Sequence, residues 1–124
     1  MNESGWPVRR IAGWWKTPAP DVLVVVDDID LPFGRLRMRE SGGSGGHNGL
    51  KSIIEVLGDT FVRLRVGIGH EGEAVDHVLS AFTPEEERSL GTIVDVAADG
   101  VMRWLDQGPA DAMNFVNAWR SEPA

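Results

Sequence analysis

The sequence predicts an α/β fold with a mostly parallel sheet, because strand-like and helix-like segments alternate along the chain. The clearest strand covers residues 22–26, an unbroken apolar run rich in valine that is typical of strands covered on both faces. The length of 124 residues, of which 42% are hydrophobic and 25% charged, is that of one globular domain. We therefore expect a single α/β domain over residues 1–124.

The first helix is predicted over residues 3–16, with Ser4 as its candidate cap. Ile11, Trp14 and Trp15 fall on one stripe of this helix. Such a stripe is typical of a face that packs on the core. We therefore interpret the Trp14-Trp15 pair as core rather than as a platform on which nucleic-acid bases stack.

Two further strands alternate between basic and apolar residues, at 35–39 and at 61–68. Both are expected to turn their arginines to one side of the sheet. The segment between them, 50–57, has one apolar stripe at helical spacing and is followed by Gly58, which predicts a helix that ends there.

Two helices are predicted near the C-terminus. The run Thr83-Pro84-Glu85-Glu86 has the pattern of a capping box with proline at the first helical position. One apolar face then continues through Leu90, Ile93, Val94, Ala97, Val101, Trp104 and Leu105. A last short helix is expected from about residue 109 to residue 119.

The strand at 22–26 raises the question of its neighbours. A strand covered on both faces needs a partner on each side, and the other two clear strands are amphipathic. We therefore expect that a further central strand lies outside this sequence.

The composition narrows the classes of function. The sequence has no cysteine, which leaves no thiolate nucleophile and no Cys-based zinc site. A net charge of −7 argues against a protein that coats nucleic acid, although residues 35–65 hold six basic residues and three acidic ones and predict a local positive face. The longest apolar run, 22–26, is too short to cross a membrane, and the N-terminus has no signal pattern. We expect a cytoplasmic protein.

The densest feature of the sequence is the glycine-rich segment 41–49, directly before the predicted helix at 50–57. Glycines allow close approach of the backbone, and a helix N-terminus offers N–H donors to an anion or a carbonyl. The segment matches neither the Walker loop nor the dinucleotide-binding pattern. By itself it fits a flexible connection as well as a phosphate cradle, and Asn48 by itself fits a helix cap.

Three carboxylates, Asp27, Asp28 and Asp30, follow the strand at 22–26. The carboxyl end of a buried strand is where α/β proteins place their sites. Alone, this cluster is more typical of a solvated turn than of a metal site, because a hard cation needs further oxygen ligands.

Four segments together carry a resemblance to a known family: 1–5, 26–34, 42–50 and 63–70. In order and spacing they resemble the signatures of the bacterial-type peptidyl-tRNA hydrolase family, and residues 78–117 are similar to that family's ending. The resemblance implies a three-layer α/β fold, with a mixed, mostly parallel sheet between helices. It leaves uncovered the family's first third, with its first strand, an asparagine and a base histidine. We therefore expect a domain that is incomplete at its N-terminus.

The family cleaves the ester bond between the peptide and the tRNA 3′ adenosine and so recycles tRNA from stalled translation. The resemblance implies that a histidine activates water, an aspartate orients this histidine, and asparagines bind the substrate. By position, Asp27 matches the orienting aspartate, whereas Asn2 and Asn48 match the asparagines. Asp28 departs from the glutamate that the family pattern leads us to expect.

The resemblance also implies residues that bind substrate or tRNA. Some of them neighbour the asparagines in the two motifs, and others occupy the region with which the family binds tRNA phosphates. The first group is Met1, Gly45, Gly46 and His47, and the second is Arg37, Arg39, Lys51 and Arg65. A structural role for His47 and a merely solvated face for the basic residues are the alternatives. The resemblance assigns no role to His70 or His77.

Peptidyl-tRNA is thus the expected partner, and the resemblance implies a cytoplasmic monomer without metal, cofactor or membrane contact. None of the three histidines matches the base position, so we expect the 124-residue chain alone to be weak or inactive. One alternative is a non-catalytic RNA-binding relative of the family. A weaker one is a metal-dependent hydrolase centred on Asp27, Asp28 and Asp30.

Overall fold

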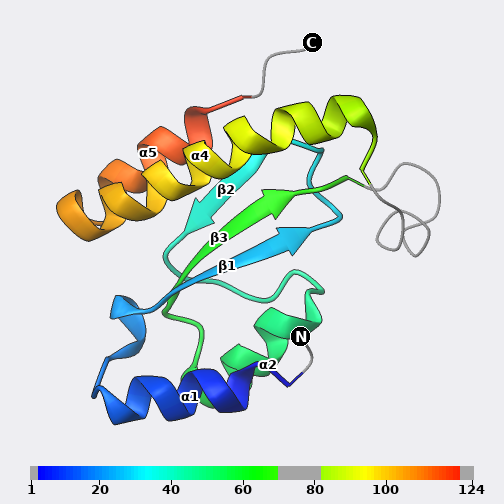
Figure 1. Ribbon diagram of the computed structural model, residues 1–124. Coiled ribbons are helices and arrows are strands. Elements are labelled where there is room, and N and C mark those ends of the chain that lie inside the picture. The colour runs from blue at the N-terminus through cyan, green and yellow to red at the C-terminus, as the bar shows by residue number, and fades with distance from the viewer. Residues whose placement is uncertain (1–2, 70–81, 121–124) are drawn as a thin grey trace. The chain divides into compact units, whose positions relative to one another are not determined.

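The computed structural model of the protein describes residues 3–69 and 82–120, which contain both helices and strands (Figure 1). The elements in chain order are α1 (Gly5–Trp14), a short 3-10 helix (Ala19–Asp21), β1 (Leu23–Asp28), β2 (Leu36–Arg39), α2 (Asn48–Leu57), β3 (Val62–Gly67), α4 (Pro84–Gln107) and α5 (Pro109–Ala118). The predicted α/β class is confirmed.

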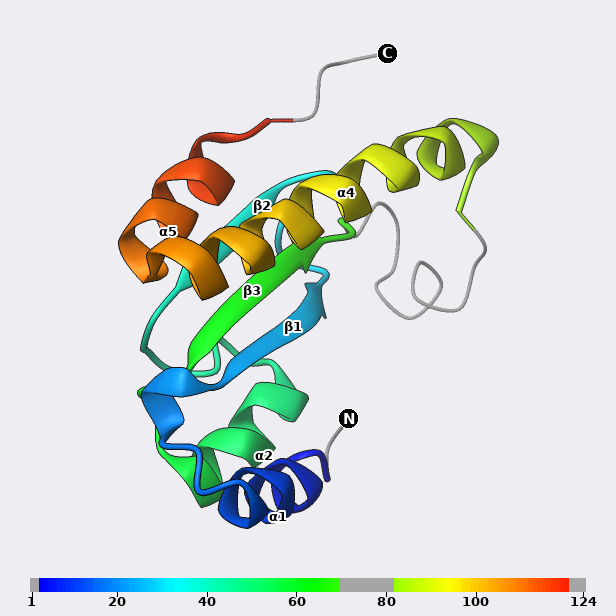
Figure 2. The ribbon, with the colours of Figure 1, turned by 60° about the vertical axis from the view of Figure 1, so that its left-hand side comes forward.

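The chain forms two compact units, of which the first comprises residues 1–24 and 39–63. In this unit α1 and α2 pack side by side (Figure 2). The contact is close because the Gly5 N–H donates to the Ser52 hydroxyl at 2.9 Å, and a Cβ added at Gly5 would overlap the Ser52 carbonyl. Glycine is therefore required where α1 meets α2.

The ends of these two helices match the prediction in part. Ser4 occupies the cap position of α1, but its side chain makes no capping hydrogen bond. The helix at 50–57 begins slightly earlier, at Asn48, and ends as expected at Gly58, which has a φ of 81°. The apolar stripe of α2 is confirmed, because Leu50 and Ile53 are fully buried.

The prediction that Trp14 and Trp15 lie in the core is wrong. Their side chains are 83% and 78% exposed, and Ile11 of the same stripe is 58% exposed. The face of α1 that packs on α2 is instead the one that holds the small residues Gly5 and Ala12, both buried. Small side chains let the two helices approach closely, so the face with Gly5 and Ala12 packs on α2. The stripe of Ile11, Trp14 and Trp15 therefore faces away from α2.

The second unit comprises residues 25–38 and 64–124. The described strands form one sheet in the order β1-β3-β2, in which β1 and β3 run in the same direction and β2 runs against them (Figure 1). Hydrogen bonds at the ends of the strands fix the register: the Ile68 N–H donates to the Asp28 carbonyl at 3.0 Å and the Gly67 N–H to the Arg35 carbonyl at 2.7 Å. The sheet is therefore mixed, as predicted.

The prediction that the strand at 22–26 is covered on both faces is wrong for the described residues. Val25 is 50% exposed, Asp27 is exposed, and Val26 and Asp28 are buried. This alternation shows that β1 has one covered face. It lies at an edge of the described sheet, and its valines reflect β propensity rather than burial on both sides.

The second unit also contains α4 and α5, which pack against each other. The capping box is confirmed, because the Thr83 hydroxyl and the Glu86 carboxylate each accept the other residue's N–H. Asn117 of α5 bonds the backbone of β2, accepting the Met38 N–H at 2.7 Å and donating to the Met38 carbonyl at 3.0 Å. A side-chain amide thus pairs with β2 as a neighbouring strand would.

The predicted apolar face of α4 is only partly buried. Ile93 is 1% exposed, but Val94 and Leu105 are 60% and 63% exposed. The covered part of the helix is narrow, and Gly100 lies so close to Val116 of α5 that a Cβ would overlap its side chain. None of the helices in the described ranges is long and apolar enough to cross a membrane.

Candidate functional site

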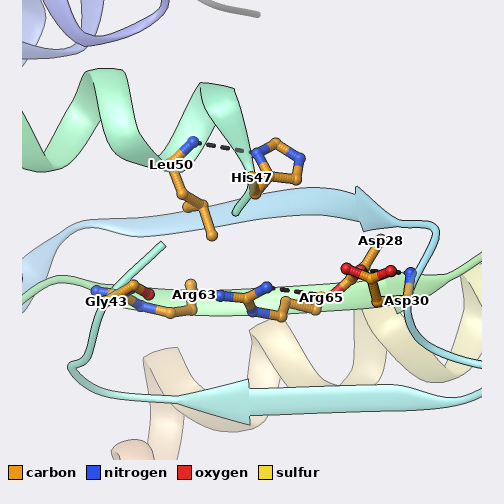
Figure 3. A network of polar contacts seen from close by, with 7 residues as sticks. All are labelled: Asp28, Asp30, Gly43, His47, Leu50, Arg63 and Arg65. Carbon is orange, nitrogen blue, oxygen red and sulfur yellow. Dashed lines mark hydrogen bonds and ion pairs between the residues drawn. The ribbon is translucent and has the colours of Figure 1, made fainter. Parts of the chain in front are cut away.

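The glycine-rich segment 41–49 is held by a buried arginine of the first unit. Arg63, at the start of β3, is 1% exposed, and its Nη1 donates to the carbonyls of Gly42 and Gly43 at 2.8 and 3.0 Å. Figure 3 shows Arg63 beside Gly43. Its Nη2 donates to the carbonyls of Asp59 and Phe61 at 2.9 and 3.3 Å. One guanidinium therefore binds the start of the glycine-rich segment to the chain that enters β3.

The alternation of β3 places Arg63 on the same side of the strand as Arg65, but Arg63 is not part of an exposed basic face. Its guanidinium stacks on the Phe61 ring at 4.3 Å and is buried, so it cannot contact a phosphate. Alternation at period two places Arg63 opposite its apolar neighbours but does not reveal that carbonyls enclose it. No pattern in the sequence indicates this contact.

The segment leads directly into α2, and the cap of that helix is His47. Its Nδ1 accepts the Leu50 N–H at 3.1 Å (Figure 3). Asn48 is therefore the first helical residue, not the cap, and it is exposed. The structural alternative for His47 is supported, and the geometry leaves the Asn48 amide at the surface beside the first turn of the helix.

The glycines before His47 shape the approach to this turn. Gly45 and Gly46 have φ values of 57° and 83°, which favour glycine, and both are exposed. Lys51, one turn further along α2, is also exposed. The first unit thus brings the predicted residues Gly45, Gly46, Asn48 and Lys51 to its surface at the start of one helix.

In the second unit, Asp28 is the buried carboxylate at the end of β1. Its Oδ1 accepts the Asp30 N–H at 2.8 Å, and its Oδ2 forms an ion pair with Arg65 Nη1 at 3.1 Å (Figure 3). The side chains of Asp28 and Arg65 are only 10% and 14% exposed. This pair fixes the turn after β1 against β3.

Asp27 differs from Asp28 in its surroundings. Successive residues of a strand point to opposite faces, so Asp27 is exposed where Asp28 is buried. Among the described residues, no group of three or more histidines and carboxylates is placed to hold a metal ion. The resemblance assigns different positions to the two adjacent aspartates, and the strand geometry adds that Asp27 is exposed and Asp28 buried.

We expect replacement of Asp28 by alanine to lower the free energy of unfolding by about 2 kcal/mol, because the Asp30 N–H and the Arg65 guanidinium both lose their acceptor. The control substitution Asp21→Ala, at an exposed aspartate, is expected to change it by less than about 0.5 kcal/mol. Urea unfolding followed by circular dichroism measures both values. Equal effects of the two substitutions would contradict the assignment of Asp28 as the structural carboxylate.

The basic residues predicted to bind tRNA differ in accessibility. Arg37 is half-buried on β2 between the buried Leu36 and Met38, and Arg39 at the end of the strand is exposed. The predicted alternation of β2 is therefore confirmed. Arg65 is engaged with Asp28 and is mostly buried. The predicted residues Met1 and Asn2, as well as His70 and His77, lie outside the described residues.

The fold and these residues define an α/β protein with polar residues at the carboxyl end of a strand and at the start of a helix that follows a glycine-rich segment. A family model described as peptidyl-tRNA hydrolase matches residues 1–124. The chain belongs to the peptidyl-tRNA hydrolase family.

Individual relatives agree with this family. Proteins named peptidyl-tRNA hydrolase from a Synechococcus strain and a Roseiflexus strain are both 48% identical to the chain, over 94% and 99% of its length. The matched stretches amount to 54% and 59% of those two relatives. A crystal structure of peptidyl-tRNA hydrolase from Acinetobacter baumannii superposes with a TM-score of 0.87 at 33% identity, covering 97% of this chain and 63% of that one. The chain thus spans little more than half the length of the two sequence relatives.

Proposed function

We propose that the protein takes part in the hydrolysis of the ester bond between peptide and tRNA in peptidyl-tRNA, and so recycles tRNA from stalled translation. The observation that carries this proposal is the match of the family model over all 124 residues. We take the reaction from the name of the relatives, and we propose roles in this reaction for individual residues of the chain.

The proposed catalytic group is Asp27, which would accept a hydrogen bond from the base histidine and hold its ring toward a water molecule. Its position supports this role, because it is exposed at the carboxyl end of β1. None of the chain's own histidines matches the base position, and His47 uses Nδ1 to cap α2. The histidine that Asp27 orients is therefore expected outside the matched stretch.

Two asparagines, Asn2 and Asn48, are proposed to bind the substrate. An amide both donates and accepts, so it can hold an ester carbonyl or the attacking water. Asn48 is exposed at the first position of α2, and the exposed Gly45 and Gly46 give the substrate close access to the backbone before it. Met1 and Asn2 keep the roles that the resemblance implies, with Met1 as a substrate-binding neighbour.

Arg37, Arg39 and Lys51 are proposed to bind tRNA phosphates, which would let the protein accept many tRNAs without reading their sequence. Arg39 and Lys51 are exposed and Arg37 half-buried, which supports direct contact. Arg65 would contribute through its positive charge beside Asp28, and His47 by fixing the first turn of α2. As the resemblance implies, we propose that the protein acts as a cytoplasmic monomer.

The proposal is tested by incubating the 124-residue chain with an N-blocked aminoacyl-tRNA and measuring the release of free tRNA, beside a gel-shift assay with deacylated tRNA. We expect binding with little cleavage by the chain alone. Arg39→Ala combined with Lys51→Ala should weaken binding about 10-fold, whereas Arg88→Ala on α4 should leave it unchanged. Rapid cleavage by the chain alone would contradict the expected low activity.

A chimeric protein tests whether Asp27 and Asn48 act in ester hydrolysis. In it, residues 1–124 replace the matched stretch of the Roseiflexus relative. We expect this chimera to cleave the substrate, and Asp27→Ala or Asn48→Ala to reduce kcat/KM about 100-fold, with the exposed Asp21→Ala as control. A chimera that binds tRNA but does not cleave the ester would favour the non-catalytic RNA-binding alternative.

A further inference from the structure

We propose that Arg63 is a positioning residue for substrate binding, because it holds the glycine-rich segment 41–49 in the conformation that receives the acyl end of the substrate. Arg63 is buried and reaches no ligand itself, so it acts through the backbone of this segment. The inference rests on the proposed function, since the substrate is the peptidyl-tRNA of that proposal.

The glycine-rich segment is held by its backbone rather than by side chains. Apart from the chain neighbours, a Cβ added at Gly42, Gly43 or Gly46 would meet none of the described residues within 4 Å. Glycine also has more backbone freedom than any other residue. The conformation of the segment therefore depends on the hydrogen bonds of its main chain.

Arg63 closes residues 42–59 into a loop. Its Nη1 donates to the carbonyls of Gly42 and Gly43 at the start of this loop, and its Nη2 donates to the Asp59 carbonyl at the end. The Gly42 N–H donates to the same Asp59 carbonyl at 3.2 Å. The loop contains most of the glycine-rich segment and all of α2. Arg63 thus fixes where the segment starts relative to the end of that helix.

The other end of the segment is fixed at the start of α2. The His47 N–H donates to the Ser44 carbonyl at 3.0 Å, which closes a turn through Gly45 and Gly46. The His47 side chain then caps the helix. Arg63 and His47 therefore hold the two ends of the short stretch that contains the two glycines.

This short stretch carries residues that are proposed to bind the substrate. Gly45 and Gly46 lie within it and Asn48 follows it, and all three are exposed, whereas Arg63 lies on the buried side. A segment that is already ordered loses little conformational freedom when a ligand binds, which favours affinity. Without Arg63 the substrate would have to order the segment, and binding would weaken.

The choice of side chain supports a role in geometry. Taking a guanidinium out of water is unfavourable, and an apolar side chain could pack on Phe61 as well. An apolar side chain cannot, however, orient several carbonyls at once. The planar guanidinium has its N–H donors in fixed directions, and four carbonyls accept hydrogen bonds from it. Such a group is suited to setting the conformation of a backbone.

The first test compares two ligands of the 124-residue chain. One is deacylated tRNA, and the other is an N-acetyl-aminoacyl-tRNA in which an amide replaces the ester, so that nothing is cleaved. Arg63→Met should weaken binding of the amide-linked analogue about 10-fold and that of deacylated tRNA less than about twofold. Arg39→Met, at an exposed residue proposed to bind phosphates, should weaken both equally. Fluorescence anisotropy measures the dissociation constants.

The kinetics of the chimera with the Roseiflexus relative give a readout that a loss of folded protein would not change. A smaller folded fraction lowers the apparent kcat but leaves KM as it was, because only intact molecules turn over. We expect Arg63→Met to raise KM about 10-fold and to change kcat less than about threefold. Arg63→Lys should also raise KM, because an ammonium group lacks the planar fork.

Hydrogen exchange of the unsubstituted chain tests the inference without any variant that could fail to fold. The N–H groups of Gly42 and His47 donate to the carbonyls of Asp59 and Ser44, so both should exchange slowly before any ligand is added. Binding of the amide-linked analogue should slow them less than about threefold further. Fast exchange that becomes slow only on binding would overturn the inference, because the substrate would then order the segment.

Two further outcomes would also overturn it. One is that Arg63→Met weakens both tRNA ligands equally, and the other is that it lowers kcat and leaves KM unchanged. The proposed hydrolase function fails separately, if the chimera with Arg63 intact does not cleave the ester. The comparison of the two tRNA ligands needs no cleavage and still tests Arg63 in that case.

Discussion

Replacing Arg63 by methionine is expected to lower the free energy of unfolding by about 3–4 kcal/mol. Methionine has a similar length and can keep the apolar contact with Phe61, so the change removes mainly the donors. The carbonyls of Gly42, Gly43, Asp59 and Phe61 then lose their hydrogen bonds to a charged group. Because water reaches the two glycine carbonyls in part, the loss is smaller than four full bonds would cost. Urea unfolding monitored by circular dichroism gives the value.

The same substitution should affect the glycine-rich segment 41–49 before the rest of the protein. Amide hydrogen exchange in this segment is expected to become faster, while exchange in α5, which belongs to the second unit, stays as it was. Arg63→Lys should recover little of the stability, because an ammonium group cannot reproduce the planar fork that reaches four carbonyls. Arg39→Met at an exposed position serves as control and should cost less than about 0.5 kcal/mol. If Arg63→Met lowered the free energy of unfolding by less than about 1 kcal/mol, the hydrogen bonds of the Arg63 guanidinium would not stabilise the fold.

Arg63 illustrates which parts of the structure the sequence could predict. Features set by neighbouring residues were predictable: the capping box at Thr83 and Glu86 and the end of α2 at Gly58 depend only on contacts within one turn. The alternation of β2 was likewise predictable, since it follows from the pleat of a strand. The burial of Arg63 depends on carbonyls twenty residues away, and no local pattern records that contact.

The errors at the tryptophans and at β1 have a related physical origin. An apolar stripe on a helix shows that this face is suited to burial. Where a helix has two such faces, the stripe does not show which one the neighbouring element covers. In α1 the small residues allow the closer approach and so determine the contact with α2. For the candidate site, the family resemblance named Asp27 and Asn48, whose roles stay proposals. Strand and cap geometry add that Asp27 is exposed where Asp28 is buried, and that His47 rather than Asn48 caps α2.

The requirement for glycine at this helix contact leads to the second large prediction. Gly5→Ala is expected to lower the free energy of unfolding by about 3 kcal/mol, because the new Cβ would overlap the Ser52 carbonyl and crowd Val56. Backbone atoms cannot rotate away as a side chain would, so α1 must move from α2 and lose the hydrogen bond from the Gly5 N–H to the Ser52 hydroxyl.

Gly13 provides the matched control in the same helix, because a Cβ added there meets nothing within 4 Å. Gly13→Ala should raise the free energy of unfolding by a few tenths of a kcal/mol up to about 1 kcal/mol, through the higher helix propensity of alanine. The same propensity gain applies at Gly5, so the difference between the two variants isolates the steric cost of separating the helices. Thermal and urea unfolding of both variants measures it. If Gly5→Ala proved as stable as Gly13→Ala, α1 and α2 would not be in the close contact that explains the exposure of Trp14 and Trp15.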